Sequence, residues 1–306
     1  MLDEHQRKMS KSLGNIVEPS DIILARLGAS KTSSKRKADS VAPAKISSAR
    51  AGSDLDAGDT RTDVPTDAAE GFGADTLRLW AASADFSKDL SIGRVAIDTV
   101  VQSLRKVRNT ARFLLSNLND FNPATDWLTR DEMLPLDLYM LSQLHAYEAE
   151  VQAAYASNNF VQWYSATTQF TSVLLSSFYF EATKVRLYTL DPTSLDRRSC
   201  QIVLAETLRV LTHSIAPVLS FMAEDIFDHT PDALRSIFDP VFLNAVRESQ
   251  KRSAVVPCAA ATSYKSVFDT PWVNLPDSYH NQELDEVCGE PPRFFFVCVI
   301  VVVLID

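Results

Sequence analysis

The chain of 306 residues is long enough for one large domain or two modest ones, and its 46% hydrophobic and 23% charged residues are ordinary for a globular protein. The formal net charge of -9 excludes a protein coated with positive charge for non-specific binding to nucleic acid, although a local basic face is compatible with it. Glycine is scarce, with 8 in the chain, and this favours helices over a sheet-rich fold.

The first motif is the polar run RKMSKSLGN at residues 7–15, which combines two lysines, two serines and a glycine. It shows no hydrophobic period, so we expect a flexible loop. Residues 16–28 then predict a short helix with Ile22, Ile23 and Leu27 on its apolar face, capped by Ser20 or Asp21.

Residues 30–70 contain no aromatic residue and few large aliphatic ones. Such a segment buries too little apolar surface to offset its conformational entropy, so we predict a disordered insert. Its basic run, residues 35–37, has two interpretations, a nuclear-import or RNA-contacting patch and a solvated charge cluster.

Apolar residues recur at spacings of three and four in several later segments, which is typical of amphipathic helices. Asp75 is expected to cap the first of them. Pro217 is expected to break or kink the last. The first helix carries Leu77, Leu79 and Trp80, and the later ones cover about residues 92–118, 134–156, 160–182 and 195–228. Four long amphipathic helices with short turns predict a mainly α fold, an antiparallel helical bundle.

Specific side chains follow from this pattern. In the helix over 160–182, the expected inward stripe runs through Phe160, Trp163, Thr167, Phe170, Leu174 and Phe178. Trp163 and Tyr164 are adjacent and cannot share a face, so one of them belongs to the core. Residues 266–276 are a short apolar piece that is expected to pack back on the bundle.

One helix also carries a strip of arginines, Arg105, Arg108 and Arg112, at helical spacing. Such a strip can grip RNA phosphates, or it can be a solvated face or pair with bundle neighbours. Lys184, Arg186, Arg197 and Arg198 are further basic candidates.

The four cysteines, Cys200, Cys258, Cys288 and Cys298, form no C-x-x-C pair and have no histidine at zinc-ligand spacing. We therefore expect reduced thiols in an intracellular protein and no zinc. Residues 1–15 show no signal peptide. The apolar run over 294–305 is shorter than the about 20 residues that a membrane helix needs, so we expect no membrane association. It is a native strand or an added terminus, and no function is assigned to it.

Five blocks in one order carry a family resemblance: RKMSKSLGNIVEPSDII, GADTLRLWAAS, LRKVRNTARFLLSNLNDFNP, SSFYFEATKVRLY and RRSCQIVLAETLRVLTHSIAPVLSFMAEDIF. Together they resemble the C-terminal half of the isoleucine-specific class I aminoacyl-tRNA synthetases. The resemblance covers residues 3–29 and 71–230, with a weak match at 266–272. RNTARFLLSNL indicates the isoleucine enzymes rather than their valine and leucine relatives.

The resemblance implies that the run at 7–15 is the signature loop. It places Lys8 and Lys11 as catalytic cations beside the phosphates of ATP, with Met9, Ser10 and Ser12 completing the ATP-binding segment. The chemistry fits, because negative charge builds on the departing pyrophosphate and lysine is a compact charge on a flexible stem. A solvated lysine loop is the alternative.

The resemblance further implies ATP with Mg²⁺, isoleucine and tRNA(Ile) as partners, with part of the arginine strip, Lys184, Arg186 and Arg197 on the RNA. We expect a monomer. The domains implied are residues 1–29, the end of the catalytic domain; 30–70, the insert; 71–92, a linker; 93–230, the anticodon-binding bundle; and 231–306, a poorly defined tail.

The chain has no His-x-Gly-His motif, so we expect a fragment that is inactive alone and contributes to charging tRNA with isoleucine in the complete enzyme. The insert at 30–70 and the block GFGADTLRLW resemble mitochondrial relatives, which implies the mitochondrial matrix, with the cytoplasm as the alternative. Two other functions stay open: a non-catalytic tRNA-binding or scaffold protein, and a helical interaction protein without RNA.

Overall fold

The structure, a computed structural model, describes residues 1–25, 71–252, 264–272 and 274–280. In this part the regular structure is helical, and the only β-type pairing consists of two isolated bridges, Leu2 with Lys8 and Leu2 with Ser91. The expected mainly α bundle is therefore confirmed. The predicted insert at 30–70, the apolar run at 294–305 and three of the four cysteines lie outside the described residues.

The longer elements follow the predicted order. They are α1 (Pro19–Ile23), α2 (Ala74–Ser83), α3 (Arg94–Ser116), α4 (Pro135–Ala156), α5 (Phe160–Gln169), the π-helix η2 (Phe170–Tyr179), α6 (Phe180–Thr189), α7 (Leu195–Ile215), α8 (Ser220–Asp228), α9 (Asp232–Arg235) and α10 (Pro240–Arg252). Short 3₁₀ turns complete them: η1 (Arg130–Glu132), η3 (Ser236–Phe238), η4 (Val267–Asp269) and η5 (Asp277–Tyr279). Helices and turns thus occur within the predicted tail.

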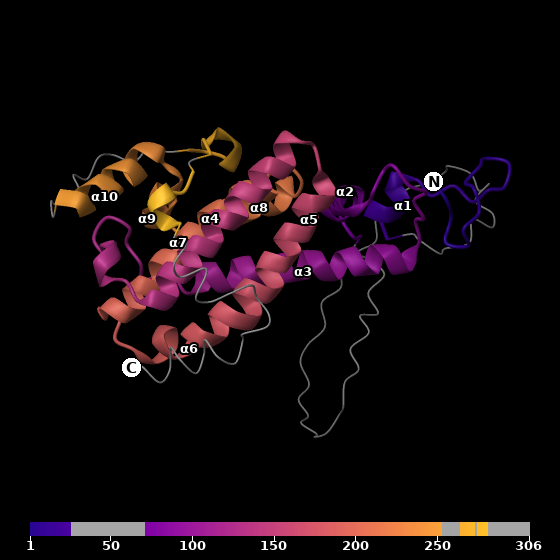
Figure 1. Cartoon of the computed structure of the whole chain (residues 1–306). Coiled ribbons are helices and arrows are strands. Elements are labelled where there is room, and N and C mark those ends of the chain that lie inside the picture. The colour runs from indigo at the N-terminus through magenta and orange to yellow at the C-terminus, as the bar shows by residue number, and fades with distance from the viewer. Residues whose placement is uncertain (26–70, 253–263, 273, 281–306) are drawn as a thin grey trace, which may run out of the picture.

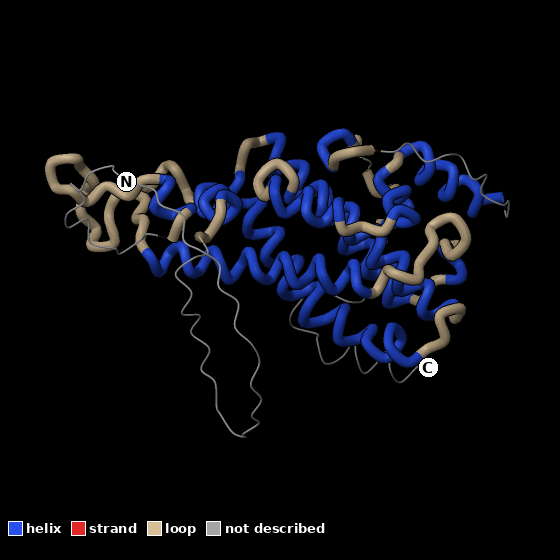
Figure 2. Tube along the Cα trace, turned by 180° about the vertical axis from the view of Figure 1, so that it is seen from behind, coloured by secondary structure: helices blue, strands red, loops and turns tan. Residues whose placement is uncertain are grey.

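The molecule is elongated (Figure 1). The N-terminus, α1 and α2 lie at one end, α9 and α10 lie at the other, and α3 runs along much of the length. Figure 2 shows that the N-terminal end is mostly loop. Within the described residues, no helix is both long enough and apolar enough to cross a bilayer.

Helix α7 lies at the centre of the bundle, and every residue from Ser199 to Ile215 is buried. The hydrophobic pattern of this helix predicts one buried apolar face, but neighbouring elements pack against it on every side. Some of its buried polar side chains are paired: Glu206 accepts a hydrogen bond from Arg209 at 2.9 Å, and Tyr147 bonds Ser214 at 2.7 Å. Among the described residues, the buried Thr207 hydroxyl and the His213 Nδ1 atom have no hydrogen-bond partner. Pro217 ends this helix as predicted, because α8 starts only at Ser220.

The predicted helix over 160–182 differs from the observed one. Ten residues, Phe170–Tyr179, form a π-helix. A π-helix takes about 4.4 residues per turn against 3.6 in an α-helix, so ten residues turn roughly half a revolution less. The buried side chains consequently move from the expected Leu174 and Phe178 to Leu175 and Tyr179.

The N-terminal part of the same helix also needs correction. Phe160 is 39% exposed rather than inward. Of the adjacent aromatic residues, Trp163 belongs to the core, and its Nε1 donates to the Ser214 carbonyl at 3.0 Å. Tyr164 is half-buried, and its hydroxyl bonds Ser103 at 2.9 Å.

Two predicted caps are also corrected. Glu18, not Ser20 or Asp21, is the N-cap of α1, and the Asp21 carboxylate accepts the Glu18 N–H at 3.0 Å from within the first turn. Gly73 is the N-cap of α2, with φ 77°. Asp75 is the second residue of α2 and caps a different helix, as described below.

The piece at 266–276 packs on the bundle as expected. Val267 and Leu275 are buried. The Glu148 carboxylate of α4 accepts the Trp272 indole N–H at 2.8 Å and the Leu275 N–H at 2.7 Å, so a single buried acid holds this segment against the helices.

Candidate functional site

The base of the loop at 7–15 is a tight turn built on Asp3. Leu2 pairs through its N–H with the Leu90 carbonyl at 2.7 Å and through its carbonyl with the Ile92 N–H at 3.1 Å. Asp3 is buried, and its carboxylate accepts the N–H groups of His5 and Arg7 at 2.9 and 2.8 Å and the Arg7 guanidinium at 2.9–3.0 Å. The turn therefore carries a local acceptor that fixes where the loop begins.

Asn15 closes the other end of the loop. Its Nδ2 donates to Asp3 at 3.0 Å and to the Lys8 carbonyl at 3.2 Å, and its Oδ1 accepts the Ser10 N–H at 2.9 Å. The bond from Asn15, with those from Arg7 and His5 and against the effect of burial, holds the pKa of Asp3 well below its usual range. Asp3 is thus a carboxylate acceptor at neutral pH.

Between these ends the chain makes a second turn. Ser10 Oγ accepts the Leu13 N–H at 3.3 Å, and the Gly14 N–H donates to the Lys11 carbonyl at 3.2 Å. Gly14 has φ 65°, the left-handed region that glycine adopts without strain. Met9 packs against the hydrophobic core. The expected loop exists, but its backbone is held at several points.

The lysine side chains of this loop face solvent. Both Lys8 and Lys11 are exposed, and within the described residues neither forms an ion pair. Ser10 lies between them in the sequence and Ser12 follows Lys11, with the two hydroxyl oxygens 3.2 Å apart. Two exposed cations with hydroxyl donors beside them fit a polyphosphate anion.

Helix α2 joins this loop to the bundle. Gly71 must be glycine, because a Cβ there would collide with the Ile23 carbonyl of α1. From α2, Asp75 accepts the Met222 N–H of α8 at 2.9 Å, and Arg78 donates to the carbonyls of Pro217 and Val218 at 2.7 and 2.6 Å. Both sides of the break between α7 and α8 are thereby capped by one helix.

Burial dominates the electrostatics of that cap. It raises the pKa of Asp75 above the usual value, and the N–H groups of Met222 and Phe221 oppose the shift. From the sequence, Asp75 is predicted to cap its own helix. It caps α8 instead, and local residue spacing cannot indicate a helix end that lies 147 residues away along the chain.

The arginine strip of α3 lies on the surface. Arg105, Arg108 and Arg112 are all exposed. Arg108 approaches Asp225 of α8 at 3.8 Å, with both side chains more than half exposed, which is a weak pair. In the part of the chain that the structure describes, no ion pair of Arg105 or Arg112 is formed. Among the described residues, the strip is thus an exposed basic face with one weak ion pair.

The other basic candidates differ. Lys184 is exposed and pairs with Glu181 at 2.5 Å. Arg186 has a side chain only 14% exposed, and it makes a two-bond ion pair with fully buried Asp137 at 2.7 and 2.9 Å. Ser199 and the Tyr179 hydroxyl donate to the same carboxylate at 2.5 and 2.7 Å. These contacts give Arg186 a role inside the bundle.

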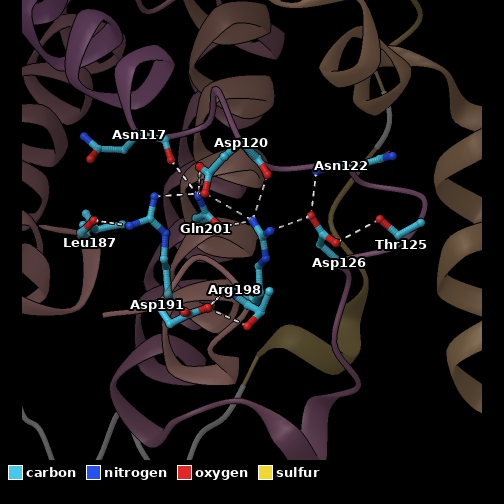
Figure 3. A network of polar contacts seen from close by, with 11 residues as sticks. Asn117, Asp120, Asn122, Thr125, Asp126, Leu187, Asp191, Arg198 and Gln201 are labelled. Atoms are coloured by element: carbon cyan, nitrogen blue, oxygen red, sulfur yellow. Dashed lines mark hydrogen bonds and ion pairs between the residues drawn. The ribbon is translucent and has the colours of Figure 1, made fainter. Parts of the chain in front are cut away.

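Arg197 and Arg198 belong to a second internal network (Figure 3). Arg197 donates to Asp120 at 3.0 Å and to the Leu187 carbonyl at 2.5 Å. Arg198 contacts the Asp120 carbonyl at 3.0 Å and Asp126 at 3.2 Å. This network fastens the end of α3 to α6 and α7, with the Arg197 side chain 15% exposed.

Sequence reasoning did not single out Asp3, Asn15, Asp120 or Asp137. For the first two a signal existed, since they are hydrogen-bonding residues at the two ends of a polar loop. For the other two, the partner is 77 and 49 residues distant along the chain. Among the described residues, no group of three or more His, Cys, Asp or Glu is placed to hold a metal ion.

Two family models match the chain. Residues 1–93 match tRNA synthetases class I (I, L, M and V), and residues 137–288 match the anticodon-binding domain of tRNA ligase. The first covers the loop and α2. The second covers most of the bundle and the segment packed on Glu148.

Several similar curated proteins are named isoleucine–tRNA ligase. The protein from Synechococcus sp. is 36% identical over 283 residues, 92% of this chain and 23% of its own length. That from Microcystis aeruginosa is 34% identical over 284 residues, 93% of this chain and 23% of its own. That from Gloeobacter violaceus is 38% identical over 230 residues, 75% of this chain and 20% of its own.

The chain therefore spans about a quarter of the length of the curated relatives that it matches. Its loop lies within the synthetase match and its helical bundle largely within the anticodon-binding match. On these observations the chain belongs to the class I aminoacyl-tRNA synthetases and is homologous to the isoleucine–tRNA ligases.

Proposed function

We propose that this chain supplies the signature loop and the tRNA-binding bundle for ATP-dependent activation of isoleucine and its transfer to tRNA(Ile). The observation that carries the proposal is a pair of exposed lysines on a backbone-anchored loop within the class I match, neither of which forms an ion pair with a described residue. The names of the relatives support isoleucine as the amino acid.

The proposed chemistry assigns the lysines to the leaving group. The isoleucine carboxylate attacks the α-phosphate of ATP, the bond to the β-phosphate oxygen breaks, and pyrophosphate departs. Negative charge on pyrophosphate grows toward the transition state, so cations that approach it lower the barrier more than they tighten substrate binding. Lys11 and Lys8 hold this role, and Ser10 and Ser12 donate hydrogen bonds. Mg²⁺ would accompany the phosphates as a charge-neutralising ion.

The bundle is proposed to bind tRNA through α3. Arg105, Arg108 and Arg112 are exposed and available for phosphates, and Lys184 is a further exposed candidate. Arg186 and Arg197 would act indirectly, since their guanidinium groups hold Asp137 and Asp120. A monomer in the mitochondrial matrix is proposed from the family resemblance and the insert at 30–70.

The test is ATP–pyrophosphate exchange in the complete enzyme, a polypeptide that carries these residues together with the nucleotide-binding half. We expect Lys11→Ala to lower the exchange rate about 100-fold or more with little change in isoleucine affinity, because the lost interaction exists mainly in the transition state. Lys88→Ala is a matched control, since Lys88 is exposed and its one ion pair within the described part of the chain is with nearby Asp85.

Unchanged exchange in Lys11→Ala would refute the role. The alternative, a tRNA-binding scaffold without catalysis, predicts that tRNA(Ile) binds to the bundle while no complete form exchanges pyrophosphate. Filter binding over a salt series distinguishes either function from a helical protein without RNA, because phosphate contacts weaken as salt rises.

A further inference from the structure

The Asn15 side chain makes three hydrogen bonds in the described structure, and all of them serve the loop. Both Nδ2 hydrogens are donated, to Asp3 and to the Lys8 carbonyl, and Oδ1 accepts the Ser10 N–H. The two loop groups lie on either side of Met9, so one amide clamps the backbone between the two lysines. We infer that Asn15 is a positioning residue for Lys8 and Lys11 and that Asp3 is its support. This rests on the proposed function.

Asp3 sets the orientation of that amide. An ionised carboxylate only accepts hydrogen bonds, so the NH₂ of Asn15 must face it. The amide oxygen of Asn15 then points to the Ser10 N–H and accepts its hydrogen bond. If the amide were turned over, its NH₂ group would face the Ser10 N–H, and two donors would meet. Arg7 offsets the charge of Asp3 at 2.9 Å, so the buried carboxylate is not left unpaired.

The rest of the loop is a preformed unit. The turn from Ser10 to Gly14 bonds to itself. Within the described residues it is joined to the base by the Asn15 amide and by the Met9 N–H, which donates to the Met1 carbonyl at 3.2 Å. Removing the amide therefore leaves the turn intact and loosens its placement.

The expected cost is in rate rather than in folding. The Lys8 carbonyl and the Ser10 N–H lie in an exposed loop, so water can replace the lost bonds. Misplacement of reacting groups by about 1 Å lowers rates about 100-fold. Asn15→Ala should thus reduce kcat while leaving ground-state affinity nearly constant.

The experiment is ATP–pyrophosphate exchange in the complete enzyme with Asn15→Ala, Asn15→Asp and, as a matched control, His5→Ala. His5 gives only its main-chain N–H to Asp3, and its side chain pairs with Glu4. Both Asn15 variants should lower kcat about 10- to 100-fold with less than about a threefold change in the KM for ATP. Asn15→Asp keeps the size but loses both donors. His5→Ala should stay within about twofold of the parent.

Amide hydrogen exchange on the same variants separates positioning from local unfolding. In Asn15→Ala the Ser10 N–H should lose protection, while the N–H groups of Leu2 and Ile92 at the base keep theirs. Loss of protection at Leu2 and Ile92 would make Asn15 a structural residue and overturn the inference.

The kinetic outcomes are also distinguishable. Unchanged kcat in Asn15→Ala beside a large loss in Lys11→Ala overturns the inference alone. A raised KM with unchanged kcat assigns Asn15 to ground-state binding and likewise overturns it. No loss in Lys11→Ala overturns the proposed function itself.

Discussion

Replacing Asp137 by alanine should destabilise the bundle severely. This carboxylate is fully buried and accepts two bonds from Arg186 at 2.7 and 2.9 Å and one each from Tyr179 and Ser199 at 2.7 and 2.5 Å. Removing one partner of a buried ion pair costs about 3–5 kcal/mol, because the other charge is left in the interior. For a unit of this size each kcal/mol lowers Tm by about 2–4 °C, so a fall of roughly 6–20 °C is expected.

Thermal and urea denaturation followed by circular dichroism at 222 nm would measure this effect. Asp131→Ala is the matched control, since Asp131 is an exposed aspartate close by and should change stability by less than about 0.5 kcal/mol. The double variant Asp137→Leu with Arg186→Met removes both charges and should be less destabilised than Asp137→Ala alone. Equal melting of Asp137→Ala and Asp131→Ala would refute the reasoning, and Arg186 would again be available as an RNA ligand.

Three further outcomes are expected. Arg108→Glu should weaken tRNA(Ile) binding in a filter assay by about tenfold with unchanged circular dichroism. Asp225→Asn, which removes the acid facing Arg108, should not weaken binding. Equal binding by the two variants would exclude the contact between Arg108 and tRNA. Burial lowers the pKa of His213 to about 4, and the unfolded value is about 6.5, so between these values the unfolded chain binds a proton that the folded chain does not. The free energy of unfolding should consequently be about 2 kcal/mol smaller at pH 5 than at pH 7, and His213→Gln should remove this difference in urea titrations; an identical pH dependence in the variant would contradict it. Deleting Ser177 should shorten the π-helix and move the Tyr179 hydroxyl away from its buried acceptor, Asp137. The deletion should therefore lower Tm far more than Ser177→Ala does. Equal Tm values would show that the π-helix does not determine which side chains of this segment face the core.

Much of the fold follows from hydrophobic periodicity. The helices over 92–118 and 134–156 are observed at Arg94–Ser116 and Pro135–Ala156, and the break at Pro217 follows from a missing N–H. The π-helix could not be predicted in this way, since a period of 3.6 residues is assumed when the stripe is drawn. The shift from Leu174 to Leu175 reflects that assumption.

The site was predictable to a different degree. The lysines of the loop follow from its motif, and the structure leaves them exposed and unpaired among the described residues. In the sequence, the arginines of α3 and those of α7 look alike, because both are clusters of basic residues within a predicted helix. Only the fold separates them, because Arg197 meets Asp120 across 77 residues of chain while Arg105 meets no acid in the described part. Charge clusters therefore predict candidates, and tertiary packing decides which stay accessible.

The hydrogen bonds from α2 to the break between α7 and α8 have a mechanical consequence. Asp75 and Arg78 bond to the two helix ends on either side of Pro217, and both residues belong to the helix that also contacts α1 beside the loop. These three bonds tie the helix beside the loop directly to the α7–α8 junction. A displacement of the loop-bearing end away from α7 and α8 would have to break them and would uncover two helix ends at once.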